Sequence, residues 1–408
     1  MTEVWSLHIL TVRDSVGVDH LDEIHVIGGN CLKGSITVQG SKNTVLPIMA
    51  ASLLQREICV LRGCPRILDV CYMEEILHIL GVVTWWKGHD LYLDCSKVCG
   101  MEIASEYTGR MRCSVILLGA LLGRNQRGVI GYPGGCVIGK RPIDFHLDVL
   151  RAMGAEILDD GGMLIAKAKK LCGTTFRFPY PSVGATENAL MAAALATKLL
   201  NCAREPEIVE LCSFLRSMGA KISGERTGTI TVDGVEKLFP TDHVTAGDRI
   251  CAGTYLAAAA AAGGEIEITG VDPVVLVEPL KALRKMGAGI RISGATGPKA
   301  RIGMVMERRP AGVEIDTGPY PGFPTDLQSV FLAVEAAGSG ESRFKETVYE
   351  ARFEAAMRLA AFGADVSLHK DTAIIRGRYP LVPGIAETPD LRGGAALLVA
   401  ALAADGLS

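Results

Sequence analysis

Cys136 stands in a segment whose residue types favour a reactive thiol. Residues 132–144 read YPGGCVIGKRPID, so glycines lie on both sides of the cysteine. Glycine adopts backbone conformations closed to other residues, as a mobile loop requires. Lys140 and Arg141 bring positive charge close to the thiol, which favours the thiolate and attracts an anionic substrate. The alternative is an inert cysteine in a turn, because free cysteines are commonly buried.

A second candidate is the segment GSKNT at residues 40–44, which precedes an apolar run at 45–54. The run predicts a helix that Ser41 caps, so that Lys42 stands at the helix N-terminus, a common place for bound anions. The segment is not a phosphate-binding P-loop, because the GxxxxGK[ST] pattern is absent. A solvated lysine in the first helical turn is the alternative.

Two further segments combine polar residues with a predicted helix start. Residues 181–188, PSVGATEN, precede a predicted helix over 189–200, and their backbone N–H groups suit a phosphate or diphosphate. Ordinary helix capping explains the same residues. The later segment FPTDLQ carries Thr325 and Gln328 at the spacing of a capping box. Asp326 is then either a first-turn carboxylate stabilised by the helix dipole or a general base that faces a substrate.

Arginines recur in polar, turn-like settings along the chain. The planar guanidinium group binds phosphate and carboxylate groups through two hydrogen bonds at once. Several arginines on separate elements therefore suit a highly anionic pair of substrates, although most surface arginines only aid solubility. The candidates are Arg112, Arg141, Arg204, Arg249, Arg352 and Arg392.

Length and composition limit the class of protein. The 408 residues allow two or three domains, and 49% hydrophobic with 21% charged residues exclude a disordered chain. A net charge of -3 and the lack of a basic tract argue against a general nucleic-acid binder. The 12 cysteines form no CxxC pair and no cluster with zinc-ligand spacing, which predicts a reducing cytoplasm and no metal site. The longest apolar stretch, residues 250–262, is shorter than the ~20 residues that span a bilayer.

A helix-ending motif recurs along the chain and predicts an internal repeat. A leucine lies four residues before each of five glycines, which are 65 to 76 residues apart: Gly81, Gly154, Gly219, Gly287 and Gly363. Glycine takes the left-handed conformation at a helix C-terminus at little cost. A strand, a turn and a second strand follow, so each unit of ~70 residues contains a helix and a hairpin, unlike a single Rossmann or TIM arrangement. A sixth motif would fall beyond Ser408, so the spacing predicts a chain that lacks its C-terminal part.

Together these segments resemble the enolpyruvyl transferase family, in particular the branch that uses UDP-N-acetylglucosamine as acceptor. The resemblance runs from about residue 24 to 407. Its most specific element is GGCVIGKRP at 134–142, which matches the family's active-site cysteine loop. Five further motifs agree in order and spacing: GSKN at 40–43, SVGATEN at 182–188, AREPEIV at 203–209, FPTD at 323–326 and DLR at 390–392.

The resemblance implies a mixed α/β (α+β) fold, the inside-out α/β barrel. This fold has two domains, each with three helix-plus-hairpin repeats around buried helices, and the sixth repeat is missing here. The resemblance places an inserted domain with the cysteine loop at 42–246 and a discontinuous domain at 20–41 plus 247–408, incomplete at its C-terminus. Residues 1–19 are then an N-terminal extension without a family counterpart.

Site residues follow from the resemblance position by position. Cys136 matches the proton donor to C3 of phosphoenolpyruvate, able to form a covalent adduct through its sulfur, and Asp326 the base near the sugar 3-hydroxyl. Lys42 is the third catalytic position, and phosphoenolpyruvate would be bound by Lys42, Asn43, Arg141 and Arg392, beside Asp390. The UDP-sugar would be contacted by Arg112, Arg141, Pro142, Ile143, Asp144, Phe145, Tyr180, Pro181, Ser182, Val183, Asp326 and Val348. No metal or organic cofactor is implied.

The implied reaction transfers the enolpyruvyl group of phosphoenolpyruvate to the 3-hydroxyl of UDP-N-acetylglucosamine and releases phosphate. This reaction is the first committed step of peptidoglycan precursor synthesis, and so serves cell wall biogenesis, cell shape and cell division. The resemblance implies a cytoplasmic monomer with these two substrates as its partners and with no nucleic acid or membrane partner.

Two alternatives remain from the sequence. Related family members transfer the same group to shikimate 3-phosphate, but they have no cysteine at the place of Cys136. A catalytically impaired, UDP-sugar-binding paralogue or a fragment is the other alternative, because a phosphate-binding arginine of the family would fall past Ser408. The unfinished core would also leave the helix at 395–403 poorly covered.

Overall fold

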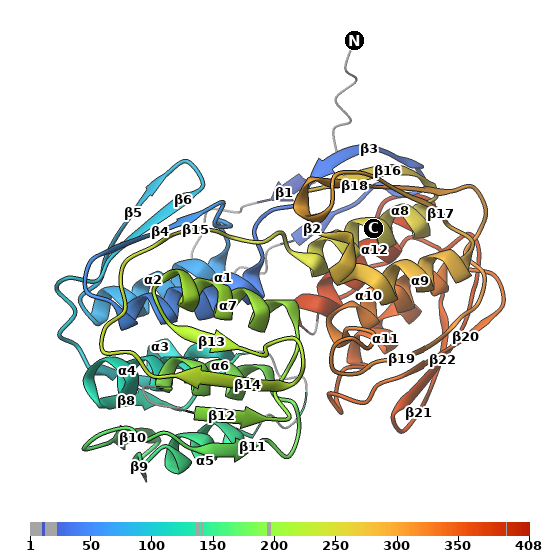
Figure 1. Cartoon of the computed structure of the whole chain (residues 1–408). Coiled ribbons are helices and arrows are strands. Elements are labelled where there is room, and N and C mark those ends of the chain that lie inside the picture. Colours follow the sequence, from blue (N-terminus) through green and yellow to red (C-terminus); the bar gives the residue numbers. More distant parts are fainter. Residues whose placement is uncertain (1–9, 13–22, 136–138, 140–141, 194–196, 389) are drawn as a thin grey trace.

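A computed structural model describes residues 10–12, 23–135, 139, 142–193, 197–388 and 390–408 of the chain. These residues form two lobes that lie side by side (Figure 1). Buried hydrophobic side chains form a separate cluster in each lobe. The first core draws on residues 45–232, and the second core draws on residues 26–38 and 250–404.

The first lobe holds three four-stranded sheets, ordered β15-β4-β6-β5, β7-β8-β10-β9 and β11-β12-β14-β13. The strands are β4 (Ile58–Arg62), β5 (Val83–Lys87), β6 (Asp90–Asp94), β7 (Glu102–Ile103), β8 (Arg127–Gly131), β9 (Glu156–Asp160), β10 (Met163–Lys167), β11 (Thr175–Arg177), β12 (Thr197–Leu200), β13 (Lys221–Ser223), β14 (Thr229–Asp233) and β15 (Asp242–Val244). The helices are α1 (Lys42–Ala51), α2 (Leu68–Ile79), α3 (Ser105–Thr108), α4 (Leu117–Asn125), α5 (Asp144–Ala152), α6 (Val183–Ala192) and α7 (Pro206–Ser217), with 3-10 turns η1 (Ser52–Leu54) and η2 (Arg112–Ile116).

The second lobe holds two four-stranded sheets, ordered β17-β18-β16-β3 and β19-β20-β22-β21, and β1 pairs with β2 nearby. The strands are β1 (Leu10–Val12), β2 (Glu23–His25), β3 (Leu32–Thr37), β16 (Gly264–Thr269), β17 (Gly289–Gly294), β18 (Ala300–Met306), β19 (Glu314–Asp316), β20 (Glu341–Lys345), β21 (Asp365–His369) and β22 (Thr372–Arg376). The helices are α8 (Arg249–Ala262), α9 (Val277–Met286), α10 (Thr325–Ala336), α11 (Glu354–Arg358) and α12 (Leu391–Ala403), with 3-10 turns η3 (Pro273–Leu276), η4 (Gly297–Lys299) and η5 (Leu359–Phe362).

All five four-stranded sheets share one topology. In each sheet a hairpin pairs antiparallel, its second strand pairs antiparallel with an earlier strand, and that strand pairs parallel with the fourth. In two sheets the parallel strand is distant in sequence: β15 joins β4, and β3 joins β16. The sheets are therefore copies of one unit, and the two exchanged strands tie residues 32–37 to the second lobe and 242–244 to the first.

The predicted internal repeat is confirmed. The five helix-ending glycines all have left-handed backbone, with φ of 98° at Gly81, 92° at Gly154, 102° at Gly219, 107° at Gly287 and 78° at Gly363. A hairpin follows each of them: β5–β6, β9–β10, β13–β14, β17–β18 and β21–β22. The mixed α/β fold follows from this unit.

Helices that are buried on all sides, and are largely apolar, lie inside the lobes. In α10 every residue from Leu327 to Ala336 is buried, and in α6 every residue from Ala185 to Ala192. A helix that is hydrophobic all round is typical of a core position. The short alanine side chains of α8 let α10 and α12 pack against it. No helix in the described ranges is long and apolar enough to cross a membrane.

The predicted start and end of one helix were wrong. The sequence predicts a helix over 189–200, whereas α6 spans 183–192 and strand β12 begins at residue 197. The helix starts earlier because Ser182 caps it by accepting from the Ala185 N–H, and because partners from other elements satisfy the buried Asn188. Asn188 accepts from the Gly119 N–H at 2.6 Å and donates to the Val115 carbonyl at 3.0 Å.

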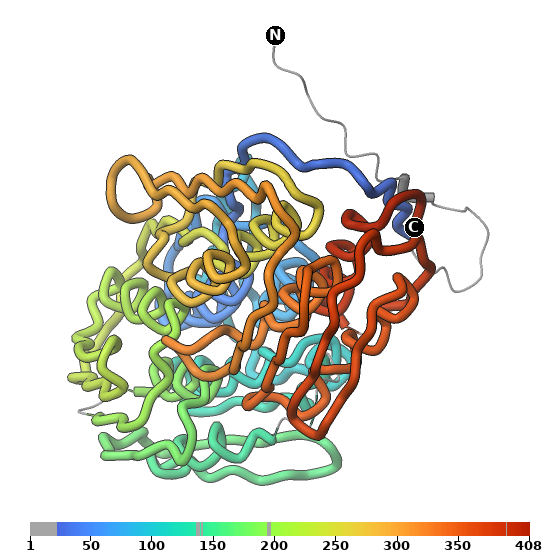
Figure 2. Tube along the Cα trace, turned by 90° about the vertical axis from the view of Figure 1, so that its right-hand side faces the viewer, coloured from blue at the N-terminus to red at the C-terminus, as the bar shows by residue number. Residues whose placement is uncertain are grey.

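The expectation of a poorly covered C-terminal helix was also wrong. In α12, Ala396, Val399 and Ala400 are buried against α8 and α10. The chain end then lies along the start of the second lobe, where Val26 and Ser408 exchange backbone hydrogen bonds of 2.9 and 2.8 Å (Figure 2). The helix therefore has cover on its inner side without a sixth four-stranded sheet among the described residues.

Glu335 is a buried acid inside the second core, with 2% of its surface exposed. Its Oε2 accepts a hydrogen bond of 2.6 Å from the Ser342 hydroxyl. Its Oε1 has no hydrogen-bond partner within the described ranges. Burial raises the pKa of Glu335 to about 7. The folded protein therefore keeps this carboxyl protonated well above the pH at which an exposed glutamate ionises.

We expect Glu335→Gln to stabilise the protein more at pH 8 than at pH 5. A raised folded-state pKa gives a stabilising contribution that is fully present below the unfolded pKa of about 4.3 and lost as pH rises through about 7. Glutamine keeps an acceptor for Ser342 and carries no charge. The extra gain at pH 8 should be on the order of 2 kcal/mol in the free energy of unfolding by urea. A gain of equal size at both pH values, or the same pH dependence in the exposed control Glu354→Gln, would contradict this account.

Candidate functional site

The chain passes between the lobes at two points that lie side by side. Residues 39–41 and 246–248 pair as a short antiparallel ladder, with N···O distances of 2.8 and 2.9 Å. Its central glycines, Gly40 and Gly247, leave no space for a side chain, because a Cβ would overlap a neighbouring backbone carbonyl. Helix α1 of the first lobe and helix α8 of the second therefore begin at the same place.

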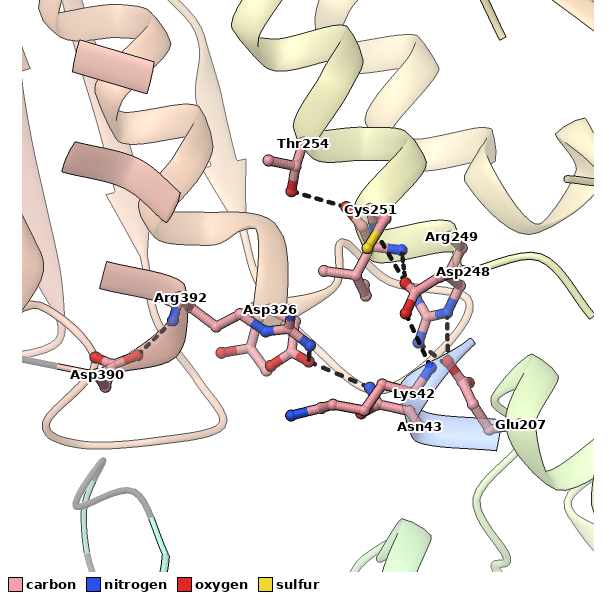
Figure 3. Close-up of polar contacts among 12 residues, drawn as sticks. Lys42, Asn43, Glu207, Asp248, Arg249, Cys251, Thr254, Asp326, Asp390 and Arg392 are labelled. Carbon is pink, nitrogen blue, oxygen red and sulfur yellow. Dashed lines mark hydrogen bonds and ion pairs between the residues drawn. The ribbon is translucent and has the colours of Figure 1, made fainter. Parts of the chain in front are cut away.

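Lys42 and Asn43 occupy the first turn of α1, next to the second lobe (Figure 3). The Lys42 ammonium lies 3.3 Å from the carboxylate of Asp69 at the start of α2. The Asn43 amide donates a hydrogen bond of 3.4 Å to Oδ2 of Asp326 on α10. The predicted lysine–asparagine pair thus faces the predicted base across the boundary between the lobes.

Asp326 lies in the first turn of α10 and accepts hydrogen bonds from three side chains. Arg392 of α12 donates to Oδ2 at 2.8 Å, beside the bond from Asn43. Arg352 donates to Oδ1 and also, at 3.4 Å, to the carbonyl of Thr325. Arg352 is only 2% exposed. Two guanidinium groups therefore fix the orientation of this carboxylate.

The carboxyl of Asp326 is ionised under ordinary conditions. Burial raises its pKa, but the charges of Arg392 and Arg352 outweigh that effect and hold the pKa well below its usual range. A carboxylate with such a low pKa is a weak base. An anion that bound Arg392 would weaken this clamp and raise the pKa of Asp326. The basicity of Asp326 therefore depends on what occupies the site.

A second ion pair crosses the boundary between the lobes. Arg249 of α8 binds Glu207 of α7 through two hydrogen bonds, of 2.9 and 3.3 Å. Both residues are buried, with 9% and 4% exposed. Burial raises the pKa of the neighbouring Glu187 to about 8 and also raises that of Glu205. The pair consequently lies in a region where carboxyl groups resist ionisation and where Arg249 supplies compensating charge.

We expect Glu207→Ala to destabilise the protein by about 3–5 kcal/mol, because it leaves the buried guanidinium of Arg249 without its counter-charge. Urea denaturation of the variant and the wild type measures the difference. The control is Glu278→Ala, which removes an exposed partner of Lys281 at 2.8 Å and should cost about 0.5 kcal/mol or less. Equal losses of unfolding free energy in the two variants would show that the buried ion pair contributes no more to stability than the exposed one.

Cys136 and Arg141, with Lys140, lie outside the described residues, whereas Gly135 and Gly139 on either side are described. Gly135 donates its N–H at 3.2 Å to a backbone carbonyl just after α3 in the first lobe. Gly139 approaches the carboxylate of Glu350 in the second lobe so closely that a Cβ would overlap it. Of the two described glycines that flank the predicted catalytic cysteine, Gly135 therefore contacts the first lobe and Gly139 contacts the second lobe. Arg112 donates a 3.4 Å bond to a carbonyl just before this segment.

Most residues predicted to contact the UDP-sugar lie at the N-termini of α5 and α6. Pro142 and Asp144 are exposed before and at the start of α5, whereas Ile143 is buried in the first core and Phe145 packs against it. The Ile143 side chain is therefore turned away from solvent. Tyr180 is exposed just before α6, and residues 181–183 are half-buried.

Val348 lies in the second lobe after β20, and Glu346 links it to the neighbourhood of Asp326. The Val348 N–H donates to Oε1 of Glu346 at 2.8 Å, and the Thr325 hydroxyl donates to Oε2 at 2.9 Å. The predicted capping box at Thr325 is therefore wrong, because its hydroxyl bonds Glu346 and makes no cap. Tyr180 of the first lobe lies near the same segment, since the charges of Tyr349 and Glu346 add to the burial that raises its pKa.

The structure thus brings Lys42, Asn43, Asp326 and Arg392 into one cluster and leaves the α5 and α6 N-termini as a separate group in the first lobe. Sequence reasoning missed two residues that contact this cluster, Asp69 and Asp248. Asp248 had a local signal, an aspartate directly before an apolar helix. Glu207, the partner of Arg249, lies in the AREPEIV motif, but the motif assigned it no role. Within the described ranges, no group of three or more His, Cys, Asp or Glu side chains could hold a metal ion.

Two lobes of repeated helix-and-hairpin units, with a cluster of lysine, asparagine, aspartate and arginine between them, are the arrangement that the sequence motifs predict for an enolpyruvyl (carboxyvinyl) transferase. A family model described as EPSP synthase (3-phosphoshikimate 1-carboxyvinyltransferase) matches residues 26–407. The chain belongs to this family of transferase enzymes.

Relatives with a more specific name are similar over nearly the whole chain. The chain is 42% identical over 403 residues to UDP-N-acetylglucosamine 1-carboxyvinyltransferase of Xanthobacter autotrophicus, with 95% of this chain and 92% of the relative covered. It is 43% identical over 391 residues to UDP-N-acetylglucosamine 1-carboxyvinyltransferase 1 of Carboxydothermus hydrogenoformans, with the same coverage of 95% and 92%. The comparisons therefore do not support the large C-terminal loss that the repeat spacing predicts, and they do not favour an impaired paralogue.

Solved structures of the same class share the fold. The enolpyruvyl transferase NikO of Streptomyces tendae superposes with a TM-score of 0.83 at 25% identity and covers 94% of this chain and 91% of its own. EPSP synthase of Acinetobacter baumannii superposes with a TM-score of 0.70 at 19% identity, with 94% and 92% covered. The second likeness concerns the fold alone.

Proposed function

We propose that this enzyme transfers the enolpyruvyl group of phosphoenolpyruvate to the 3-hydroxyl of UDP-N-acetylglucosamine and releases phosphate. The observation that carries the proposal is the Lys42, Asn43, Asp326 and Arg392 cluster at the boundary of the lobes, in a chain about 40% identical to relatives of that name. The reaction begins peptidoglycan precursor synthesis. We assign the protein to the cytoplasm as a monomer, where both substrates are made.

Phosphoenolpyruvate brings a phosphate and a carboxylate, and the cluster offers several cations. Lys42 and Arg392 lie on opposite lobes, so each is available to one end of the substrate, and Arg141 of the cysteine segment is the third proposed cation. Cations aimed at these groups stabilise the charge that develops during the reaction. Binding of the substrate would therefore draw the lobes together.

In the proposed reaction Cys136 gives a proton to C3 of phosphoenolpyruvate, which generates oxocarbenium character at C2. The sugar 3-hydroxyl attacks C2 and gives up its proton to Asp326, which forms a tetrahedral intermediate. Loss of a proton from C3 and departure of phosphate then restore the double bond in the product. The proton acceptor must be stronger than the arginine-clamped Asp326 of the unliganded protein. The substrate anion on Arg392 weakens the clamp, so the base gains strength only when phosphoenolpyruvate is present.

The proposed binding site for UDP-N-acetylglucosamine extends from the first lobe to the second. We assign the nucleotide to the N-termini of α5 and α6, with Asp144, Tyr180 and Ser182, and the sugar to the side of Val348 and Asp326. Backbone N–H groups at a helix N-terminus bind phosphate groups well. The first lobe with its inserted residues 42–246 and the second lobe with 20–41 and 247–408 are, in this proposal, the two domains that enclose the substrates.

Phosphate release with two alternative acceptors tests the proposal. The purified protein is mixed with phosphoenolpyruvate and either UDP-N-acetylglucosamine or shikimate 3-phosphate, and inorganic phosphate is measured. We expect release with the UDP-sugar and none above background with shikimate 3-phosphate. Release with shikimate 3-phosphate alone would replace the proposal with the sister reaction. Binding of the UDP-sugar without release, even at high enzyme concentration, would point to a binding protein.

A further inference from the structure

The carboxylate of Asp248 accepts hydrogen bonds from the N-termini of two helices (Figure 3). Its Oδ1 accepts hydrogen bonds from the Ile250 and Cys251 N–H groups at 2.8 and 3.0 Å, which caps α8 of the second lobe. Its Oδ2 accepts the Lys42 N–H at 3.0 Å, at the first residue of α1 in the first lobe. Asp248 is 3% exposed. One buried carboxylate therefore connects the starts of two helices from different lobes.

Helix α1 has no cap of its own. Ser41 stands at the N-cap position, as the sequence predicts, but its side chain makes no capping hydrogen bond. The first N–H groups of a helix have no partner inside the helix, so their loss of solvent must be compensated from elsewhere. Asp248 supplies that partner from 206 residues away in the chain. The positive ends of two helix dipoles also stabilise a negative charge between them.

The position of Asp248 connects it to the substrate cluster. Lys42 and Asn43 are the first two residues of α1, and Arg392 lies on α12. Burial lowers the pKa of Arg392, but the negative charges of Asp326 and, next in size, Asp248 raise it more, so the pKa lies above its usual value. Asp248 therefore also lies near the Arg392 guanidinium. A shift at the start of α1 would therefore move Lys42 and Asn43 relative to the second lobe.

We propose that Asp248 is a positioning residue that locks the first turn of α1 against the first turn of α8 and so sets Lys42 and Asn43 opposite Asp326 and Arg392. Its direct partners are backbone N–H groups, and it acts on the substrates through them. The substrate part of this inference rests on the proposed function. The structural part, the lock between two helix starts, does not.

A competing role for Asp248 predicts a change of opposite direction in the KM for phosphoenolpyruvate. If Asp248 acted only as a counter-charge beside the anion-binding cations, its neutralisation would strengthen the binding of phosphoenolpyruvate and lower its KM. If it positions α1, its neutralisation misplaces Lys42 and raises that KM. The direction of the change therefore separates the two roles.

Asp248→Asn and Asp248→Glu test the proposal. Asparagine keeps an oxygen that can cap α8 but turns an NH2 donor toward the Lys42 N–H, and glutamate keeps the charge but moves it. We expect both variants to raise the KM for phosphoenolpyruvate about tenfold, while the KM for UDP-N-acetylglucosamine changes less than about threefold. An unchanged or lowered KM for phosphoenolpyruvate in Asp248→Asn would overturn the proposal. The control is Asp272→Asn, at an exposed cap of η3 with one N–H partner at 3.1 Å, and it should leave both KM values unchanged.

Amide hydrogen exchange of the same proteins gives a readout that needs no activity. We expect faster exchange in peptides from the start of α1 in Asp248→Asn and little change at the start of α8, where the cap is kept. Equal exchange in wild type and variant at α1 would overturn the lock between the helices. If the wild-type protein releases no phosphate, the proposed function fails, and the exchange result still decides the inference. If Asp248→Asn does not fold, Asp248→Glu carries both measurements under the same criteria.

Discussion

Asp326→Asn is expected to lower kcat by about 10²–10⁴-fold, the usual contribution of a positioned acid–base group. The asparagine has nearly the same shape, so it can still occupy the space between Arg352 and Arg392. It cannot accept the proton of the sugar hydroxyl, and it offers no negative charge to the guanidinium groups that hold it. The loss should therefore appear in kcat and kcat/KM together, as it does when an interaction of the transition state is removed.

A folding defect has to be separated from this catalytic loss. The folded-state pKa of Asp326 is depressed, so its stabilising contribution is present above the unfolded pKa of about 3.9 and lost as pH falls further. At neutral pH the variant loses that contribution, so urea denaturation must accompany the kinetics. UDP-N-acetylglucosamine should still shift the thermal unfolding of a folded variant. The control Asp316→Asn removes an exposed partner of Arg343 at 3.3 Å and should keep full activity. A kcat of Asp326→Asn within about threefold of wild type would remove Asp326 from the chemistry.

Cys136→Ser is expected to lower kcat about 10²-fold or more, because a serine hydroxyl ionises far above neutral pH and is a poor proton donor. The same variant should form no covalent adduct with phosphoenolpyruvate and should resist epoxides of the fosfomycin type, since both react with the thiolate. Intact-protein mass spectrometry with and without substrate measures the adduct. Cys172→Ser, which removes an exposed thiol of the first lobe, is the control and should behave as wild type. Full activity and full epoxide sensitivity in Cys136→Ser would refute the role.

The pKa of the Cys136 thiol should depend on ligand. Lys140 and Arg141 favour the thiolate, whereas a proton donor should titrate near the working pH. A bound phosphate group next to the thiol opposes the lysine and arginine charges and restores the protonated form. Titration of the thiol with and without phosphoenolpyruvate tests this effect, and an identical curve in both would count against it.

The repeat could be predicted from sequence because its cause is local. Each of the five repeat glycines ends the helix directly before it, and no distant residue is needed to place it in the left-handed region. Alternation and turn residues then mark the hairpin that follows. The hairpins were therefore within reach of single-sequence reasoning. The two further strands of each sheet were not predicted, and the exchanged strands β3 and β15 join segments that are distant in the chain.

The errors concern groups whose partners lie far away in the chain. Ser41 was expected to cap α1, and the bond comes from Asp248 in the other lobe. Thr325 was expected to form a capping box, and its hydroxyl instead donates a hydrogen bond to Glu346, which lies just after strand β20. Buried polar groups take whichever partner the tertiary fold provides. Local motifs therefore gave the right segments and the wrong contacts.

In the candidate site, too, the sequence predicts the residues but not the contacts between them. The types and order of Lys42, Asn43, Asp326 and Arg392 follow from family motifs, and the structure adds that Asn43 and Arg392 meet on one oxygen of Asp326. The low pKa of Asp326 had no sequence signal, because it depends on arginines from two further segments. In the proposed mechanism, that clamp couples the basicity of Asp326 to the presence of an anionic substrate.

Incorporation of solvent deuterium tests the central claim most directly. The protein is incubated in D₂O with phosphoenolpyruvate and UDP-N-acetylglucosamine, and the product is examined by mass spectrometry and proton NMR. Addition of a proton to C3 followed by its loss predicts an enolpyruvyl ether on the sugar 3-oxygen, with deuterium in its vinyl CH₂ group and one phosphate released per product. A product without vinyl deuterium, or no enolpyruvyl product while phosphoenolpyruvate is consumed, would contradict the account.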